Sequence, residues 1–161
     1  MPRTDNELRV TPSVLDRLLD YEPGVAREPP ASRARSLRQF KESVKRDLEW
    51  LLNTRRTAGE LPEGLDEAGR TLLLYGLPDF TSLSVKSPSD QKQLRHALES
   101  AIRMFEPRLD GVVVTLDPLR ENERVLRFRI DAQLRVEPAP EPVSFDTLFQ
   151  MGSGRYIVQG E

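Results

Sequence analysis

The chain has 161 residues, which is the length of one domain or of one domain with a tail. Its 24 basic and 26 acidic residues leave a net charge of -2, which excludes a protein that is basic over its whole surface, as a nucleic-acid coat would be. It has no cysteine and a single histidine, His96, which excludes disulfides, zinc–cysteine sites, thiol nucleophiles and two-histidine metal sites.

Residues 1–35 are rich in proline and charge and are expected to form an N-terminal extension. A short amphipathic helix is predicted inside it from four apolar residues at helical spacing: Val14, Leu15, Leu18 and Leu19. The proline-rich segment 22–35 is typical of a linker. A short helix on a linker cannot bury its apolar side alone, so it either docks on a partner or folds back on the core, and the sequence leaves both open.

Residues 36–56 predict a long amphipathic helix, because apolar residues recur at steps of three and four: Leu37, Phe40, Val44, Leu48, Leu51 and Leu52. The segment 33–56 has a net charge of +5, so the remainder of the chain carries -7. A basic helix face is usually solvated, and we expect no nucleic-acid partner. A module that binds a regulator or nucleic acid through Arg38, Lys41, Lys45 and Arg46 stays open as an alternative.

A second long helix is predicted from Ser87, a capping residue followed by Pro88, to Phe105 or Glu106, because Pro107 disfavours helical geometry before it. The apolar period then changes to two. Strands are predicted at 112–116, 126–136, around 143–148 and at 155–159. Helices followed by strands predict an α+β domain over 36–161, with amphipathic helices packed on one face of a mostly antiparallel sheet.

Glu106-Pro107-Arg108 places two opposite charges at a rigid corner between the second helix and the first strand. Three interpretations are open, and the residues favour them in this order. The first is a structural salt bridge that ends the helix, and the second is a recognition corner in which Arg108 contacts a partner carboxylate or backbone. The third is a peptidoglycan-type glycoside hydrolase using Glu106 with Asp110, but a neighbouring Arg108 lowers a carboxyl pKa, which is wrong for a general acid.

The sequence has few features typical of membrane-spanning segments, cofactor or metal sites, or catalytic residues. No apolar stretch has signal-peptide form or approaches the roughly 18 residues that span a bilayer, so we expect a cytoplasmic protein without membrane insertion. There is no glycine-rich phosphate loop, and the loop aspartates lack a coordinating spacing. His96 lies off the apolar stripe of its helix. We therefore expect no catalytic residue, no metal and no cofactor.

Four segments in order carry a family resemblance: 13–20, 44–56, the Leu-Tyr-Gly-Leu-Pro-Asp-Phe stretch at 74–80, and Glu106-Pro107-Arg108. Together they resemble TssE, the baseplate wedge subunit of the bacterial type VI secretion system, from about Thr11 to Val158. That family is similar to the wedge protein of contractile phage tails that was once labelled a lysozyme.

The resemblance implies an assembly protein and no enzyme. It implies that Glu106, Pro107 and Arg108 contact the helical core of the wedge, whose other subunits are TssF-like and TssG-like. It also implies that the sheet offers a strand edge, from the 125–159 region, on which the contractile sheath subunits begin to polymerise. An exposed edge of an antiparallel sheet is suited to such strand addition.

Overall fold

The computed structural model describes residues 10–19, 23–24, 32–57, 71–80, 84, 87–118, 125–150 and 152–160. Its helices, in chain order, are α1 (Val14–Leu18), α2 (Arg33–Asn53), the short 3₁₀ helix η3 (Leu72–Leu74) and α3 (Pro88–Phe105). Its strands are β1 (Leu109–Leu116), β2 (Val125–Leu134), β3 (Glu141–Gln150) and β4 (Arg155–Gly160). No helix among these residues combines the length and apolar character that a membrane-spanning segment requires.

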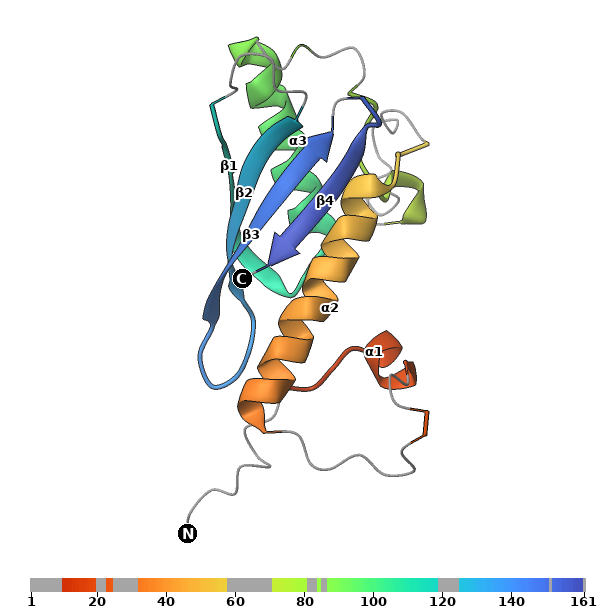
Figure 1. Cartoon of the computed structure of the whole chain (residues 1–161), viewed down its shortest axis with the longest axis vertical. Coiled ribbons are helices and arrows are strands. Elements are labelled where there is room, and N and C mark those ends of the chain that lie inside the picture. Colours follow the sequence, from red (N-terminus) through yellow and green to blue (C-terminus); the bar gives the residue numbers. More distant parts are fainter. Residues whose placement is uncertain are drawn as a thin grey trace.

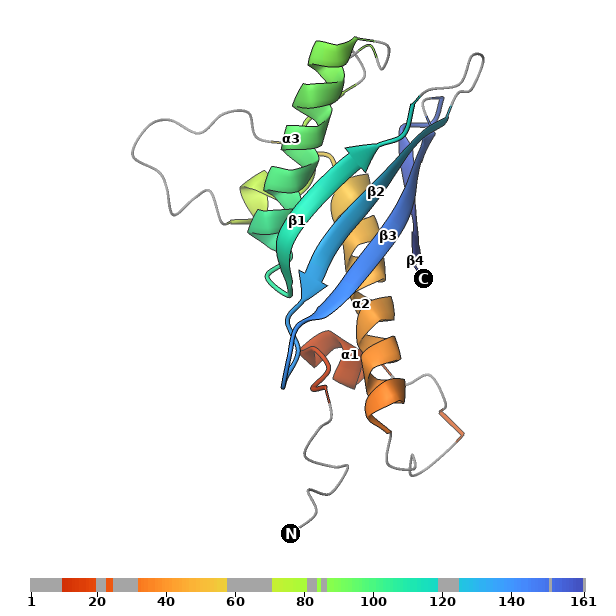
Figure 2. The same cartoon turned by 90° about the vertical axis from the view of Figure 1, so that its left-hand side faces the viewer.

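The four strands form one antiparallel sheet in the order β1-β2-β3-β4, so each strand lies beside its neighbour in the sequence. Helices α2 and α3 cover one face of this sheet, with α2 along β4 and α3 along β1 (Figures 1 and 2). The α+β class and the helix-covered antiparallel sheet predicted from the sequence are confirmed.

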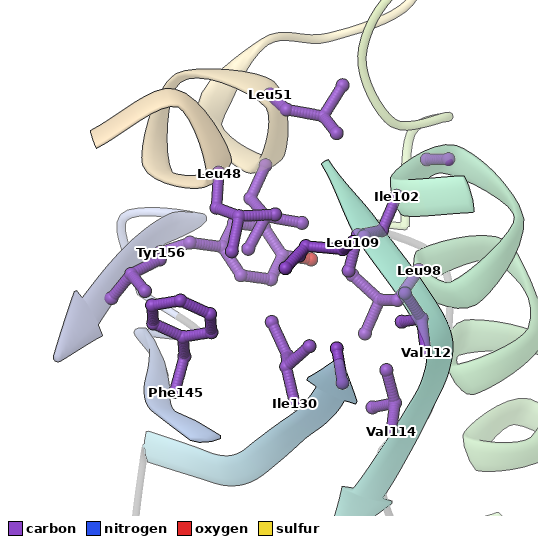
Figure 3. Close-up of a cluster of buried hydrophobic side chains, with 14 of the residues drawn as sticks. Leu48, Leu51, Leu98, Ile102, Leu109, Val112, Val114, Ile130, Phe145 and Tyr156 are labelled. Atoms are coloured by element: carbon purple, nitrogen blue, oxygen red, sulfur yellow. The ribbon is translucent and has the colours of Figure 1, made fainter. Parts of the chain in front are cut away.

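The core lies between the two helices and the covered face of the sheet. From Leu126 to Leu134 of β2, residues alternate between buried and exposed, because successive side chains of a strand point to opposite faces. Figure 3 shows the buried side chains that meet from α2, α3 and all four strands, among them Leu48, Leu98, Ile102, Val112, Ile130, Phe145 and Tyr156. The open face of the sheet is charged and carries cross-strand ion pairs such as Arg129–Asp146 and Arg135–Asp110.

Most elements lie where the sequence predicts them, with shifted ends. Helix α2 begins earlier than expected because the Ser32 hydroxyl accepts a hydrogen bond from the Arg35 N–H. Strand β3 begins at Glu141 and includes Pro142, which is tolerated because β4 pairs with β3 only from Phe145 onward. Two predicted segments lie largely outside the described residues. They are the linker before Ser32 and the connection between β1 and β2.

The end of α2 is tied to the loop before α3 by a short parallel bridge between Arg55 and Leu77. The Leu77 N–H donates to the Thr54 carbonyl, and the Arg56 N–H donates to the Leu77 carbonyl, both at 2.8 Å. Gly76 makes this close approach possible. It has φ +104°, and a Cβ atom there would lie 2.3 Å from the Thr54 carbonyl oxygen.

We predict that Gly76→Ala lowers the free energy of unfolding by more than about 2 kcal/mol, because the bridge must open and the backbone is strained. Gly152→Ala is the control, since Gly152 has no atom within 4 Å of its would-be Cβ. Urea denaturation measures both variants. Equal effects at the two positions would contradict the role given to Gly76.

Candidate docking corner

Residues 106–109, which we call the corner, form a tight turn between α3 and β1. The Leu109 N–H donates to the Glu106 carbonyl at 3.2 Å, so Pro107 occupies the second turn position, where its fixed φ is favourable. The Arg108 N–H donates to Glu106 Oε1 at 3.2 Å. The Glu106 side chain therefore folds back over its own turn and holds the path from helix to strand.

Arg108 and Glu106 form an ion pair on the inner side of the corner. Arg108 Nε donates to Glu106 Oε1 at 2.6 Å, and Arg108 Nη2 donates to Glu106 Oε2, so the guanidinium holds both carboxylate oxygens. Glu106 is only 3 % exposed, whereas Pro107 beside it is exposed. A carboxylate buried this deeply needs a partner of opposite charge, and Arg108 provides it.

Helix α2 holds Arg108 from the other side. Arg108 Nη2 also donates to Asp47 Oδ2 at 2.6 Å, and Nη1 donates to the Ser43 hydroxyl at 3.3 Å. The guanidinium lies over the ring of Phe40, 5.7 Å from its centroid. Phe40, Ser43 and Asp47 share one face of α2 because they are three and four residues apart. The corner is therefore fastened to α2 by polar as well as apolar contacts.

The same network continues to α1. Asp47 Oδ1 accepts hydrogen bonds from Arg46, at 2.9 Å from Nε and 2.8 Å from Nη2, and Arg46 Nη1 donates to Asp16 at 2.8 Å. The Ser13 hydroxyl caps α1 and donates to Asp16 at 2.5 Å. Five charged groups thus alternate in sign from Asp16 to Glu106, and they connect the N-terminal helix to the corner.

The network shifts the pKa values of Arg108 and Asp16. Burial alone would lower the pKa of Arg108, but its hydrogen bonds and charge interactions with Glu106, and then with Asp47, raise it well above the usual value. Burial favours a higher pKa for Asp16, but hydrogen bonds from Ser13 and Arg46 and the charge of Arg46 lower it below 3.8. The raised pKa of Arg108 and the lowered pKa of Asp16 keep both groups charged at neutral pH.

The segment that ends at Tyr75 lies next to the corner, because the Tyr75 ring contacts Phe105 at the end of α3. The two rings meet edge to face at 5.2 Å, and burial together with the charges of Asp47 and Glu106 raises the pKa of Tyr75. Three exposed apolar side chains lie within three residues before these two rings in the sequence, namely Leu72, Leu73 and Met104. The surroundings of the corner thus combine an exposed proline with exposed apolar groups, which is a composition suited to contact with another protein.

The structure brings some predicted site residues together and leaves others apart. Glu106 and Arg108 face inward and bind each other, as the structural interpretation of this triplet expected, while Pro107 faces solvent. A contact between the triplet and a partner stays a prediction. The four apolar residues of the predicted docking helix are exposed by 40 to 76 %: Val14, Leu15, Leu18 and Leu19. The polar side of α1, with Asp16, faces α2 instead.

The alternative interpretations find little support in the geometry. Asp110, the suggested partner of Glu106 in hydrolysis, is exposed and bound to Arg135 at 2.6 Å, whose hydrogen bonds and charge lower its pKa. The basic face of α2 is partly neutralised, since Arg46 binds two aspartates and Lys45 lies 3.6 Å from Glu42. His96 is exposed on α3, and no cluster of metal-ligating side chains occurs among the described residues.

The sequence did not identify Asp16, Ser43 and Asp47 as members of the site. The spacing of four between Ser43 and Asp47 indicated a shared helix face, but no local pattern links that face to a residue some sixty positions later. Only the packing of α2 against the end of α3 brings Asp47 to Arg108.

We predict that Arg108→Met lowers the free energy of unfolding by about 3 kcal/mol, because it leaves the buried Glu106 carboxylate without its partner. Arg135→Met is the matched control, since it breaks an ion pair whose side chains are 57 % and 54 % exposed, and we expect little change there. Chemical denaturation at neutral pH measures both variants. An effect of Arg108→Met no larger than that of Arg135→Met would contradict the buried network.

We predict that α1 leaves α2 when the pH falls through the lowered pKa of Asp16. A carboxyl group whose pKa is lower in the folded state stabilises that state above its unfolded pKa and loses this contribution as it becomes protonated. The loss therefore occurs below 3.8, the ordinary pKa of an aspartate. NMR signals of α1 followed between pH 6 and about pH 2.5 measure it, and Asp16→Asn should show α1 already released at pH 6. An Asp16→Asn variant with unchanged α1 signals would contradict the account.

A family model described as baseplate wedge protein gp25 matches residues 38–139, which is more than half of the chain. The match includes most of α2, all of α3 and the corner, and it is shorter than the resemblance from Thr11 to Val158 inferred from the sequence. Among curated proteins, none matches.

This match confirms the resemblance to the TssE family at the level of the wedge proteins to which TssE is related. The family is structural, which agrees with the expectation of a protein that is not an enzyme. The chain belongs to the gp25 family of baseplate wedge proteins, structural components of phage-tail-like baseplates that contact other baseplate and tail components.

Proposed function

We propose that this chain is the TssE-type baseplate subunit of a type VI secretion system. It works in the cytoplasm, joins TssF-like and TssG-like wedge subunits, and starts assembly of the contractile sheath by pairing a strand edge with a sheath subunit. The observation that carries this proposal is the family match over 38–139, which contains the Glu106-Pro107-Arg108 triplet.

The corner is the proposed contact with the helical core of the wedge. Glu106 and Arg108 bind each other, and Arg108 also binds α2, so their part in docking is to hold Pro107 in place. Pro107, which is exposed, meets the partner together with the nearby apolar groups. A turn fixed before binding loses little conformational entropy on binding, which favours affinity. This assignment explains why a conformationally rigid proline lies between Glu106 and Arg108, whose side chains are held by hydrogen bonds inside the protein.

Helix α1 provides a second proposed contact. Its Asp16 side is bound to Arg46, and its exposed apolar residues Val14 and Leu18 are one helical turn apart on the outer side. An apolar stripe of this kind fits against a helix of a partner subunit. The ion pair to Arg46 keeps this stripe near the corner, so one partner surface can contact both.

The sheet provides the proposed contact with the sheath. Its outer strands carry backbone groups at the edges of an otherwise complete antiparallel ladder, and strand addition uses such groups without any catalytic side chain. A sheath subunit that pairs with this chain would then repeat the pairing with its next copy.

We predict that Pro107→Glu lowers the amount of TssF-like and TssG-like subunits that co-purify with this chain by about tenfold or more, which corresponds to the loss of a central contact. The domain should remain folded, because Pro107 is exposed. Pull-down of the co-expressed subunits, with a thermal unfolding scan of each variant, measures both properties.

The matched control is Ser89→Glu, an equally charged change at an exposed position in the first turn of α3, far along the helix from the corner. It should leave co-purification unchanged. Undiminished co-purification with Pro107→Glu would contradict the corner contact. Failure of the unmodified chain to co-purify with these subunits would contradict the proposed function itself.

A further inference from the structure

One face of the four-stranded sheet is not covered by any described element, because α2 and α3 both pack on the other face (Figure 2). The burial pattern of each strand and the register of the ladder identify the residues that share this open face. An antiparallel sheet face that meets only water normally carries polar side chains, while the apolar ones face the core. The open face of this sheet follows that rule in one half and departs from it in the other.

The half near the end of β2 has its charges matched within the sheet. Arg135 Nε and Nη2 each donate to Asp110 at 2.6 Å, and Arg129 Nε donates to Asp146 at 2.8 Å. Both pairs join neighbouring strands and are exposed. The arginines of this half therefore already have acidic partners among the described residues.

The half where β2 and β4 begin and β3 ends is built differently. It contains six residues, two from each of three strands, which we call the open-face block. They form two rows across the ladder, Arg127–Leu148–Ile157 and Val125–Gln150–Arg155. The three aliphatic side chains of the block are half-buried, although no described element packs over them. Aliphatic residues on three adjacent strands of an open face form a small apolar surface.

Two exposed arginines lie at opposite corners of the block. Arg127 and Arg155 form no ion pair or side-chain hydrogen bond with the other described residues. Neighbouring strands are about 4.8 Å apart and alternate residues of a strand about 6.8 Å, so the Cα atoms of these arginines are about 12 Å apart. The diagonal between them passes over Leu148, with Val125 on one side and Ile157 on the other. The block is thus an apolar surface with an unmatched cation at each end.

An amphipathic α-helix fits this arrangement. Helix residues seven apart rise about 10.5 Å and lie on one face, with the third and fourth residues after the first of them between the two. Acidic side chains at the two ends of such a stretch would reach Arg127 and Arg155, and apolar side chains in the middle would lie on Leu148. Burial of apolar surface then contributes affinity, while the two charge pairs set the orientation.

The described helices of this chain do not provide such a face. Glu42 and Glu49 of α2 are the only acidic residues seven apart in α1, α2 or α3, and Lys45 and Arg46 lie between them. A second copy of the chain would therefore place cations over the apolar centre of the block. A different protein is the better fit, and proteins of the gp25 family contact other baseplate and tail components.

We propose that the open-face block binds an amphipathic helix of another baseplate or tail component. This helix places acidic residues seven apart over Arg127 and Arg155 and apolar residues over Leu148. It covers the sheet from the side opposite α2 and α3 and completes a third layer. The inference goes beyond the proposed function, because it requires neither a TssF-like or TssG-like subunit nor a sheath subunit.

A synthetic alanine-based peptide of about 20 residues, long enough to form a helix in water, serves as the probe. Its centre reads Glu-Ala-Ala-Leu-Leu-Ala-Ala-Glu. A control peptide of the same composition has one glutamate moved to the opposite face of the helix. Nitrogen-15 NMR of the full chain follows the backbone amides while each peptide is added.

The expected result is a set of shifts centred on Leu148 and Ile157, with about tenfold tighter binding of the probe than of the control peptide. Equal affinity for the two peptides would overturn the inference, because it would show that only total charge matters. Shifts centred on the basic residues of α2, or no binding of either peptide, would overturn it as well.

Reversing the charges of the block tests the same contact from the side of the protein. Arg127→Glu combined with Arg155→Glu should weaken probe binding by about tenfold or more, because like charges would then face each other. Arg35→Glu combined with Arg38→Glu is the matched control, since it changes the charge equally at two exposed positions of α2. This control should bind the probe as the unmodified chain does.

Equal weakening in the two double variants would overturn the inference, since it would indicate general attraction between opposite charges. A thermal unfolding scan of each variant shows whether it is folded. If the block variant fails to fold, the comparison of the two peptides on the unmodified chain decides the question.

Discussion

The burial of the Glu106 carboxylate, held on both oxygens by Arg108, is the constraint on which the rest of the site depends. Glu106 closes the turn that joins α3 to β1, and Arg108 extends from that turn to Asp47 on α2. This ion pair therefore fixes the path of the chain and the position of Pro107. Through Asp47 it also fixes where α2, about sixty residues earlier in the sequence, packs. A charge pair so enclosed contributes mainly specificity of arrangement, because its desolvation offsets much of its attraction.

The proposed contact surfaces depend on α2. One side of α2 holds the corner and α1 through Asp47 and Arg46, and another side is joined to β4 through Asn53. A rigid helix bound to both the corner and the sheet allows a subunit to meet the wedge at one surface and the sheath at another while keeping their relative positions. The total charge of -2 does not show that α2 is positively charged, because the rest of the chain carries an opposite net charge.

Local patterns predicted most of the fold but only part of the site. The capped start of α3, the alternation in β2 and the proline after α3 depend on neighbouring residues, so the sequence alone placed them. The sequence also identified Glu106, Pro107 and Arg108, because a charged pair around a proline stands out. It could not identify Asp47 or Asn53, whose roles depend on which distant segment packs beside α2, and polar residues on a helix give no sign of such a neighbour.

The central claim is that Arg108 is held inside the protein and stays there when the wedge forms. Nitrogen-15 NMR of the arginine Nε–H groups measures this directly, in the free chain and in its complex with TssF-like and TssG-like subunits. We predict a separate, slowly exchanging Arg108 Nε–H signal in both states, because Glu106 Oε1 accepts its proton at 2.6 Å and the Arg108 side chain is 19 % exposed, against 57 % for Arg135. A rapidly exchanging Arg108 signal like that of the exposed Arg135 in the free chain, or the loss of the protected signal on binding, would contradict it.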